Sequence, residues 1–325
     1  MSLHVLQPGL LTTVQDRGRH GWRHLGIARA GALDPDAAAL ANRLVGNDPD
    51  AAVLEMTLQG PTLRFDVPTR IALCGAWLPM KFTSSTGVAA HIPGGRPVSL
   101  PAGELSLGAA CDGTRAWLAI GGGLDVPPVL GSRSTDLRGG FGGLAGRALR
   151  AGDRLHVSAA PDPGPEPRFP AWWVDPLAHD RQPHGRAAPI RYVPAHLPGA
   201  DAFARMPWRA SARSDRQGLR LDGEALSLDT HEQISAPVAP GTVQLPPDGR
   251  PIVLLADAQT VGGYPRLGHV IAVDLQRLAQ LRPGQPVHFS ACDARTATQL
   301  ACAARARLAR ITLMIDFKLQ RGYGE

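Results

Sequence analysis

Short apolar runs separated by turn residues dominate the chain. Between residues 52 and 122 the runs include AVLEMTL, RIALCGA and RAWLAIGG, with Gly, Pro and Asp residues between them. Runs of this length with such boundaries indicate strands, because helices need longer periodic segments. The pattern returns after residue 189 in IRYVPA, TVQL and PIVLLADA, where PPDGRP predicts a hairpin turn between the last two. The chain is therefore predicted to be mainly β.

A few segments have helical patterning instead. In LDPDAAALANRLVG, Asp34 is placed to cap a helix, Pro35 takes its first position and Gly46 lies just past its end. The segment DLQRLAQLRPG predicts a short helix capped by Asp274. The segment ARTATQLACAARARLARITLMI predicts a longer closing helix. One face of this helix carries Leu300, Ala301, Ala304 and Leu308.

A change in composition divides the chain. After the glycine-rich stretch GSRSTDLRGGFGGLAGRALR the sequence becomes APDPGPEPRFP, a proline-rich polar segment typical of a linker. A short echo, L-R-x-G before a strand, occurs at 149–157 and 281–289. It suggests two related halves, although all-β proteins also reuse such turns. We predict an N-terminal domain at residues 1–165, a linker at 166–188 and a C-terminal domain at 189–325.

Composition and charge narrow the function classes. The net charge is +6, but 32 of the 34 basic residues are arginines spread along the chain, so we expect no nucleic-acid partner. The chain has no G-x-x-x-x-G-K-[ST] motif and no apolar run long enough for a membrane helix. Four scattered cysteines imply neither zinc nor a disulfide framework. We therefore expect a cytoplasmic protein without a metal site or membrane anchor.

Three polar, glycine-marked stretches are candidates for a functional site. They are QDRGR at 15–19, RSDRQGLR at 213–220 and LLADAQTVGGYPRLG at 254–268. Asp accepts hydrogen bonds, Arg donates paired bonds to carboxylate or phosphate, and Gly lets backbone N–H groups approach an anion. Such a set can bind a small anion or an amide. The alternative is that each Asp–Arg pair only braces a tight turn.

Five long motifs, occurring in one order, resemble a known family. The motifs are PGLLTTVQDRGRHGW, GALDPDAAALANRLVGN, GGLDVPPVLGSRSTDLRGGFGG, ARSDRQGLRLDG and GTVQLPPDGRPIVLLADAQTVGGYPRLGHV. They resemble the family that includes the C subunit of 5-oxoprolinase, also called KipA or allophanate hydrolase subunit 2. That family includes the carboxyltransferase domain of biotin-dependent urea carboxylase. The resemblance implies two cyclophilin-like β-barrel domains, mainly β with a few helices.

The resemblance also implies an activity and partners. The expected function is ATP-dependent hydrolysis of 5-oxoproline to glutamate by a complex with the A and B subunits of 5-oxoprolinase, of which the KipI-like B subunit is the most direct partner. ATP is used by the complex, and no recognisable motif in this chain binds a cofactor. One alternative is a carboxyltransferase that acts with a biotin carrier on urea or a related amide. Another is a KipA-type regulator that binds a kinase inhibitor without catalysis.

The polar stretches supply the expected site residues. 5-Oxoproline and urea share an N–C=O unit, so we expect Asp257 to accept from the substrate N–H and Gln259 to donate to its carbonyl. Asp16 is expected to act as a base or to orient an arginine. Charge that develops on the carbonyl oxygen can be stabilised by backbone N–H groups. The expected substrate-binding residues are Arg17, Glu55, Asp215, Arg216, Gly262, Gly263, Tyr264 and Arg266.

The sequence departs from the family pattern in three places. The usual S-G-A-M-D is Ala30-Gly31-Ala32-Leu33-Asp34 here, and the usual G-G-Y-P-K ends in Arg266. The segment IRYVPAHLPGADAF lacks the expected G-P-Q. Arginine keeps the charge of lysine but not its geometry or its ability to transfer a proton. The exact substrate is therefore left open between 5-oxoproline, urea and another amide.

Overall fold

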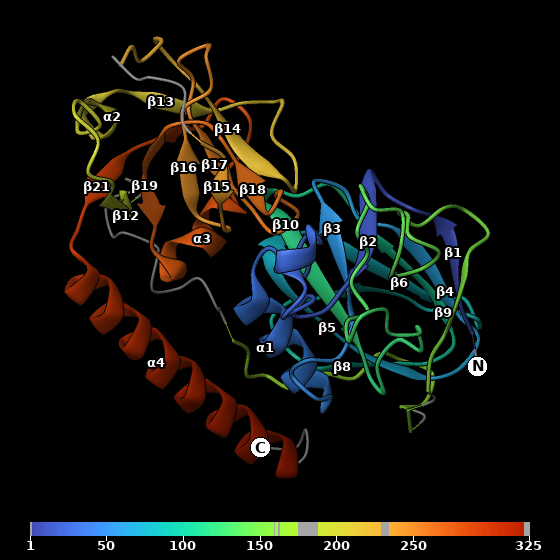
Figure 1. Ribbon diagram of the computed structural model, residues 1–325. Coiled ribbons are helices and arrows are strands. Elements are labelled where there is room, and N and C mark those ends of the chain that lie inside the picture. Colours follow the sequence, from blue (N-terminus) through green and yellow to red (C-terminus); the bar gives the residue numbers. More distant parts are fainter. Residues whose placement is uncertain (1, 159, 162, 175–187, 229–233, 322–325) are drawn as a thin grey trace. The chain divides into compact units, whose positions relative to one another are not determined.

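The computed structural model describes residues 2–158, 160–161, 163–174, 188–228 and 234–321 (Figure 1). The described chain is mainly β with a few helices, which confirms the predicted fold class. Its contacts define two compact units. Unit 1 comprises Met1–Gly18, Asp34–Ala178 and Leu308–Glu325, and unit 2 comprises Arg19–Leu33 and His179–Arg307.

The predicted domain limits, 1–165 and 189–325, stay a prediction, because these units are defined by contacts rather than by independent folding. Most of the predicted linker at 166–188 falls on 175–187, outside the described residues.

Unit 1 contains two antiparallel sheets. Their strand orders are β11-β1-β4-β9-β6-β7 and β2-β3-β10-β5-β8. The first sheet consists of β1 (Ser2–Gln7), β4 (Thr62–Phe65), β6 (Met80–Ser84), β7 (Ala89–Ile92), β9 (Gly103–Leu107) and β11 (Arg154–His156). The second consists of β2 (Leu11–Gln15), β3 (Val53–Thr57), β5 (Thr69–Trp77), β8 (Val98–Leu100) and β10 (Asp112–Ile120).

The two sheets of unit 1 bury their apolar side chains in one core. In β6 and β9 buried and exposed residues alternate, so that Phe82 and Leu105 join the core while Lys81 faces out. Strand β10 is instead buried at every position from Thr114 to Ile120. Helix α1 (Pro35–Val45) contacts β10 and β5, so these strands are covered on both faces and carry continuous apolar runs.

Helix α1 has the ends that the sequence predicts. The Asp34 carboxylate accepts a hydrogen bond from the Ala37 N–H at 2.9 Å, and Pro35 is the first helical residue. Gly46 ends the helix at a φ of 82°, a left-handed conformation that favours glycine. The predicted capped helix is confirmed.

Unit 2 contains an eight-stranded sheet with the order β20-β13-β14-β17-β16-β19-β12-β21 and a small sheet of β15 and β18. The β12–β21 pair is parallel, and the other pairs are antiparallel. Its strands are β12 (Ile190–Pro194), β13 (Trp208–Ala210), β14 (Gly218–Asp222), β15 (Ala236–Pro237), β16 (Thr242–Gln244), β17 (Ile252–Leu254), β18 (Val261–Gly262), β19 (Arg266–Val270), β20 (Pro286–Val287) and β21 (Phe289–Ala291).

Aromatic residues form one part of the unit 2 core. Phe203, in the short helix α2 (Ala202–Arg205), has its ring centroid 4.4 Å from that of Phe289 and 5.2 Å from that of Tyr192. These distances suit offset or edge-on ring packing. The predicted hairpin is also confirmed, because β16 and β17 pair antiparallel with Val243 opposite Val253.

The predicted role of Asp274 is wrong. Helix α3 (Ala272–Leu278) follows Ile271, which holds the N-cap position, and Asp274 lies inside the first turn. The Asp274 carboxylate accepts from the Arg191 backbone N–H at 2.7 Å and from its guanidinium at 2.7 and 2.9 Å. A buried carboxylate gains more from these charge-assisted bonds than from one capping bond.

The predicted closing helix is confirmed and is longer than expected. Helix α4 spans Ala294–Gln320, and the Asp293 carboxylate accepts from the Thr296 N–H at 2.7 Å at its start. The predicted face, Leu300, Ala301, Ala304 and Leu308, is half-buried. In the described part of the chain, no helix combines the length and apolar character needed to cross a membrane.

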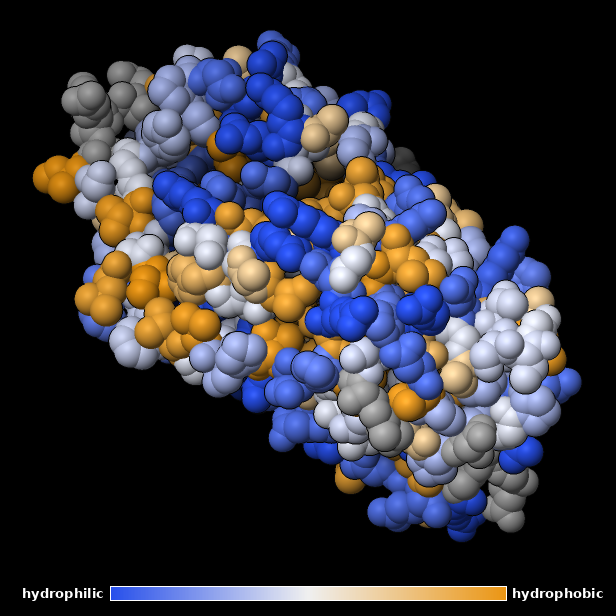
Figure 2. Space-filling view, turned by 90° about the vertical axis from the view of Figure 1, so that its right-hand side faces the viewer, coloured by the Kyte–Doolittle hydropathy of each residue, from blue (hydrophilic) through white to orange (hydrophobic). Residues whose placement is uncertain are grey.

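Some large apolar side chains are exposed on both units. Trp77 in unit 1 and Ile234 in unit 2 are examples, and Met314 is exposed on α4. Figure 2 shows one face of the molecule, on which apolar and hydrophilic residues are interspersed. Exposed apolar residues of this kind are normal on protein surfaces.

Replacing Asp34 tests the cap of α1. Asp34→Ala should lower the free energy of unfolding by about 1 kcal/mol, because the Ala37 N–H loses its acceptor. Asp34→Asn is the matched control, since an amide oxygen caps a helix nearly as well. Urea denaturation measures both variants, and an equal loss in the two would contradict the capping role.

Candidate functional site

The Asp16 carboxylate fixes a loop in unit 1. It follows β2 and accepts hydrogen bonds from the Ser132 hydroxyl at 2.6 Å, the Ser134 hydroxyl, the Arg133 backbone N–H and the Gly18 N–H. The two hydroxyls and the Arg133 N–H belong to the GSRST segment that the sequence marks by its glycines. These bonds give Asp16 a clear structural role, and its predicted catalytic role stays a prediction.

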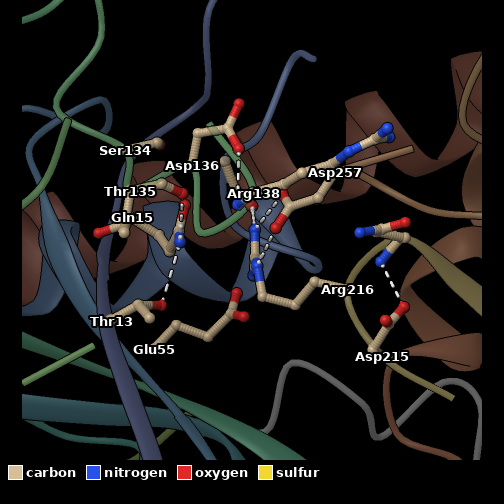
Figure 3. A network of polar contacts seen from close by, with 12 residues as sticks. Thr13, Gln15, Glu55, Ser134, Thr135, Asp136, Arg138, Asp215, Arg216 and Asp257 are labelled. Atoms are coloured by element: carbon tan, nitrogen blue, oxygen red, sulfur yellow. Dashed lines mark hydrogen bonds and ion pairs between the residues drawn. The ribbon is translucent and has the colours of Figure 1, made fainter. Parts of the chain in front are cut away.

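Two further polar side chains make hydrogen bonds within unit 1. The Gln15 amide donates to the Thr13 hydroxyl at 3.0 Å and to the Thr135 carbonyl at 3.2 Å, as Figure 3 shows. The Glu55 carboxylate accepts from the Trp117 indole N–H at 2.9 Å, and both side chains are buried. Glu55 therefore links β3 to β10, where sequence reasoning expected a substrate contact.

The main polar contact of unit 2 is a buried ion pair. Arg216 donates from Nε to one oxygen of Asp257 and from Nη2 to the other, both at 2.9 Å (Figure 3). The side chains are only 4% and 3% exposed. The same Nη2 donates to the Gly31 carbonyl at 2.6 Å. Burial of this pair is tolerated because the paired geometry satisfies the charges directly.

The local sequence explains why these two residues meet. The Asp215 carboxylate accepts from the N–H groups of Gln217 and Gly218, which turns the chain into β14. Strand β14 pairs with β17, and the pairing continues beyond it as the Asp257 N–H donates to the Arg216 carbonyl at 3.0 Å. The side chains of Arg216 and Asp257 therefore extend from backbone positions that a hydrogen bond joins.

The segment Arg19–Leu33 is attached to unit 2 at the same place. The Ala30 N–H donates to the Ala256 carbonyl at 3.0 Å, and the Arg19 N–H donates to the Arg29 carbonyl at 2.7 Å. Ala30 and Gly31 both have positive φ values, of 52° and 91°. The chain thus makes a tight turn beside the ion pair. In this turn Ala30 stands where the family's S-G-A-M-D pattern has serine.

A second polar group forms around Gln244. Its carbonyl oxygen accepts from the Gln259 amide at 3.3 Å, while its own amide nitrogen is buried and donates to no protein atom. A Cβ at Gly262 would lie 2.5 Å from that nitrogen, so a larger residue there would have to displace the Gln244 side chain. Arg266 lies opposite Gln244 in the β16–β19 pair. Sequence reasoning missed Gln244, which appeared only as one residue of the strand TVQL.

Two arginines of the 19–33 segment complete the unit 2 site. Arg23, in the short 3-10 helix η1 (Arg23–Leu25), donates from Nη2 to the Val238 carbonyl and, at 3.5 Å, to the Gln259 carbonyl. Burial lowers the pKa of Arg23. Burial also lowers the pKa of Arg29, the charges of Arg23 and Arg216 lower it further, and Asp257 raises it. The sequence shows these arginines but not that their segment joins unit 2.

The predicted residues divide between the two units. Asp257, Arg216, Gln259, Gly262 and Arg266 belong to unit 2 and lie near the ends of its paired strands. Gly263 and the exposed Tyr264 follow in the same loop, and Asp215 stays in its exposed turn.

The remaining predicted residues belong to unit 1. Arg17 forms an exposed ion pair with Asp50, with Nε 2.7 Å from the carboxylate, while Asp16 and Glu55 are buried. Within the described ranges, no group of three or more His, Cys, Asp or Glu residues is placed to hold a metal ion.

Comparison with known proteins gives consistent matches over most of the chain. The family model for the carboxyltransferase domain, subdomain A and B, matches residues 25–291. The 5-oxoprolinase C subunit of Escherichia coli (strain K12) is 42% identical over 293 residues, which are 90% of this chain and 91% of that protein. The protein of the same name from Haemophilus influenzae is 34% identical over 97% of this chain and 99% of its own length.

Solved structures share the fold. The Kluyveromyces lactis urea carboxylase has a TM-score of 0.80 at 28% identity, over 94% of this chain and 29% of that one. The structure of TTHA0988 has a TM-score of 0.75 at 37% identity, over 89% of this chain. The present chain spans 55% of the TTHA0988 chain, so each of these solved proteins contains a large additional part.

Breaking the buried ion pair should reduce stability strongly. Arg216→Met should lower the free energy of unfolding by about 3–5 kcal/mol, because it leaves the Asp257 carboxylate buried without its guanidinium. The double variant Arg216→Met/Asp257→Leu should recover part of this loss, since neither charge remains. Urea denaturation of the wild type, Arg216→Met, Asp257→Leu and the double variant gives this double-mutant cycle.

An exposed pair in the same protein supplies the control for that cycle. Arg17→Met removes the ion pair with Asp50 and should change the free energy of unfolding by less than about 1 kcal/mol. Strictly additive losses from Arg216→Met and Asp257→Leu would show that the two side chains do not stabilise each other.

Proposed function

The chain belongs to the family of carboxyltransferase domains with subdomains A and B, and we propose that it acts as the C subunit of a 5-oxoprolinase complex. The complex hydrolyses 5-oxoproline to glutamate at the expense of ATP. The observation that carries this proposal is the 42% identity with the E. coli protein over nearly the full length of both chains. A yeast urea amidolyase from Lachancea kluyveri is 31% identical, and the match covers only 18% of that protein.

The polar groups of unit 2 suit a cyclic amide as substrate. The unpartnered amide nitrogen of Gln244 and the amide of Gln259 can donate to the lactam carbonyl and to the negative charge that develops on it. An ionised carboxylate has about four acceptor sites, so Asp257 can accept from a substrate N–H as well as from Arg216. In this proposal Arg216 holds the Asp257 carboxylate in one orientation.

Partner proteins are part of the proposal. The related proteins are named as the C subunit of 5-oxoprolinase, which implies at least one other polypeptide in the complex. We assign ATP binding to the A or B subunits, because the chain lacks a P-loop motif, and the KipI-like B subunit is the most direct partner. The complex is placed in the cytoplasm, which fits four free cysteines.

The family description supports one alternative. The TM-score of 0.80 with urea carboxylase fits a carboxyltransferase that uses a biotin carrier and acts on urea or a related amide. A KipA-type regulator remains the non-enzymatic alternative. A regulator binds its partner normally after substitutions at Asp257 or Gln259, whereas an enzyme loses turnover.

Reconstitution with the partner proteins tests the function directly. The chain co-purified with the A and B subunits should form glutamate from 5-oxoproline only when ATP is present, and the chain alone should be inactive, because no nucleotide site is recognisable in it. Glutamate is measured by coupled assay. Carboxylation of urea with an added biotin carrier, without glutamate formation, would favour the carboxyltransferase instead.

The role of Asp257 is tested in the same complex. Asp257→Ala should reduce turnover by at least about tenfold, since a positioned polar group is lost from the reacting amide. Asp257→Asn keeps the side-chain shape, and circular dichroism shows whether each variant is folded. Asp50→Ala, at an exposed ion pair, is the control. Turnover close to wild type in a folded Asp257→Ala complex would refute the assignment.

A further inference from the structure

In unit 2, Arg29 lies within electrostatic reach of Arg23, Arg216 and the carboxylate of Asp257. The charges of Arg23 and Arg216 lower the pKa of Arg29, and the charge of Asp257 raises it. Both oxygens of Asp257 are already bound by Arg216. The ion pairs between described residues of unit 2 do not include Arg23 or Arg29.

The positions of Arg23 and Arg29 follow from backbone contacts. The residue after Arg29 donates its N–H to the Ala256 carbonyl, directly before Asp257. Arg23 is bound through its Nη2 to the carbonyls of Val238 and Gln259. The Arg23 guanidinium and the backbone next to Arg29 thus lie along the segment that carries Asp257 and Gln259, and both side chains are partly exposed.

Both arginines keep unused donors in buried positions. The Nη1 atom of Arg23 and the Nε atom of Arg29 are shielded from solvent and donate to no protein atom. A shielded donor without an acceptor costs free energy, and like charges held close together add to this cost. A bound anion offsets both costs, because its oxygens accept from the free N–H groups and its charge balances the pair.

We propose that Arg23 and Arg29 form a carboxylate-binding subsite beside the Asp257–Gln259 segment, and that it holds the carboxylate of the lactam substrate. This inference rests on the proposed function and deepens it. 5-Oxoproline carries a carboxylate next to its ring amide, whereas urea carries none. The subsite therefore selects an acidic lactam over a neutral amide.

The neighbouring groups favour a carboxylate over a phosphate as the ligand. Arg23 donates to the backbone carbonyl of Gln259, whose side-chain amide donates to Gln244, so amide donors and a positive charge belong to one group of contacts. A free phosphate uses only the charge contact. A small molecule with an amide and a carboxylate uses both, and paired Arg N–H groups match the two oxygens of a planar carboxylate.

The test compares two lactams that differ in the carboxylate, 5-oxoproline and 2-pyrrolidinone. Their dissociation constants for the full chain are measured by ligand-observed NMR. The wild-type chain should bind 5-oxoproline at least about tenfold more tightly, a ratio that corresponds to roughly 1.4 kcal/mol. Arg23→Gln and Arg29→Gln should each weaken 5-oxoproline binding by about tenfold and leave 2-pyrrolidinone binding unchanged.

Arg250→Gln is the matched control. It removes one positive charge from an exposed position before β17, while Asp257 follows that strand, so it should change neither dissociation constant. Two separate arginine variants keep the test valid if one of them misfolds. Equal binding of the two lactams by the wild-type chain, or equal weakening of both in the arginine variants, overturns the subsite.

Inorganic phosphate separates the two possible anions. Loss of phosphate binding in the arginine variants, with 5-oxoproline binding unchanged, assigns the arginines to a phosphate and overturns the carboxylate subsite. Failure of the proposed function is distinguishable from these outcomes. A reconstituted complex that forms no glutamate refutes the function, even where the isolated chain separates the two lactams through Arg23 and Arg29.

Discussion

The buried ion pair of Arg216 and Asp257 is the contact on which the candidate site depends. A charge in the interior must be paired and hydrogen-bonded, so each partner fixes the position of the other. Arg216 also binds the Gly31 carbonyl, which connects the pair to the Arg19–Leu33 segment. One guanidinium group thus joins β14, the residues after β17 and a segment that lies nearly two hundred positions earlier in the chain.

Unit 1 uses an acidic side chain in a related way, with a different partner. Asp16 follows a strand, as Asp257 does, but its carboxylate accepts from hydroxyl and backbone groups of the 131–135 loop instead of an arginine. A carboxylate that accepts from several neutral donors can hold a loop in place. The sequence presents the two Asp residues as equivalent, whereas the structure gives them different partners.

The local elements could be predicted from the sequence because short-range physics decides them. The cap of α1 depends on residues three positions apart, and the β16–β17 hairpin depends on a turn of a few residues. Asp274 was wrongly predicted, because its partner Arg191 lies far away in sequence and outweighs the local capping signal. The membership of Arg23 and Arg29 in unit 2 was missed for the same reason. No periodicity or turn motif shows that residues 19–33 leave the unit that surrounds them in the chain.

Two departures from the family pattern can now be judged from their surroundings. Ala30 binds the Ala256 carbonyl through its backbone N–H, so an alanine in place of serine leaves that hydrogen bond intact. The positive φ of Ala30 is held by this bond and by the Arg216 contact at Gly31. Arg266 is different, because it lies opposite Gln244, whose amide belongs to the candidate site. A guanidinium there keeps the charge of lysine but directs its donors in a fixed plane. The alanine departure therefore preserves the scaffold, while the arginine departure changes the side chain opposite Gln244.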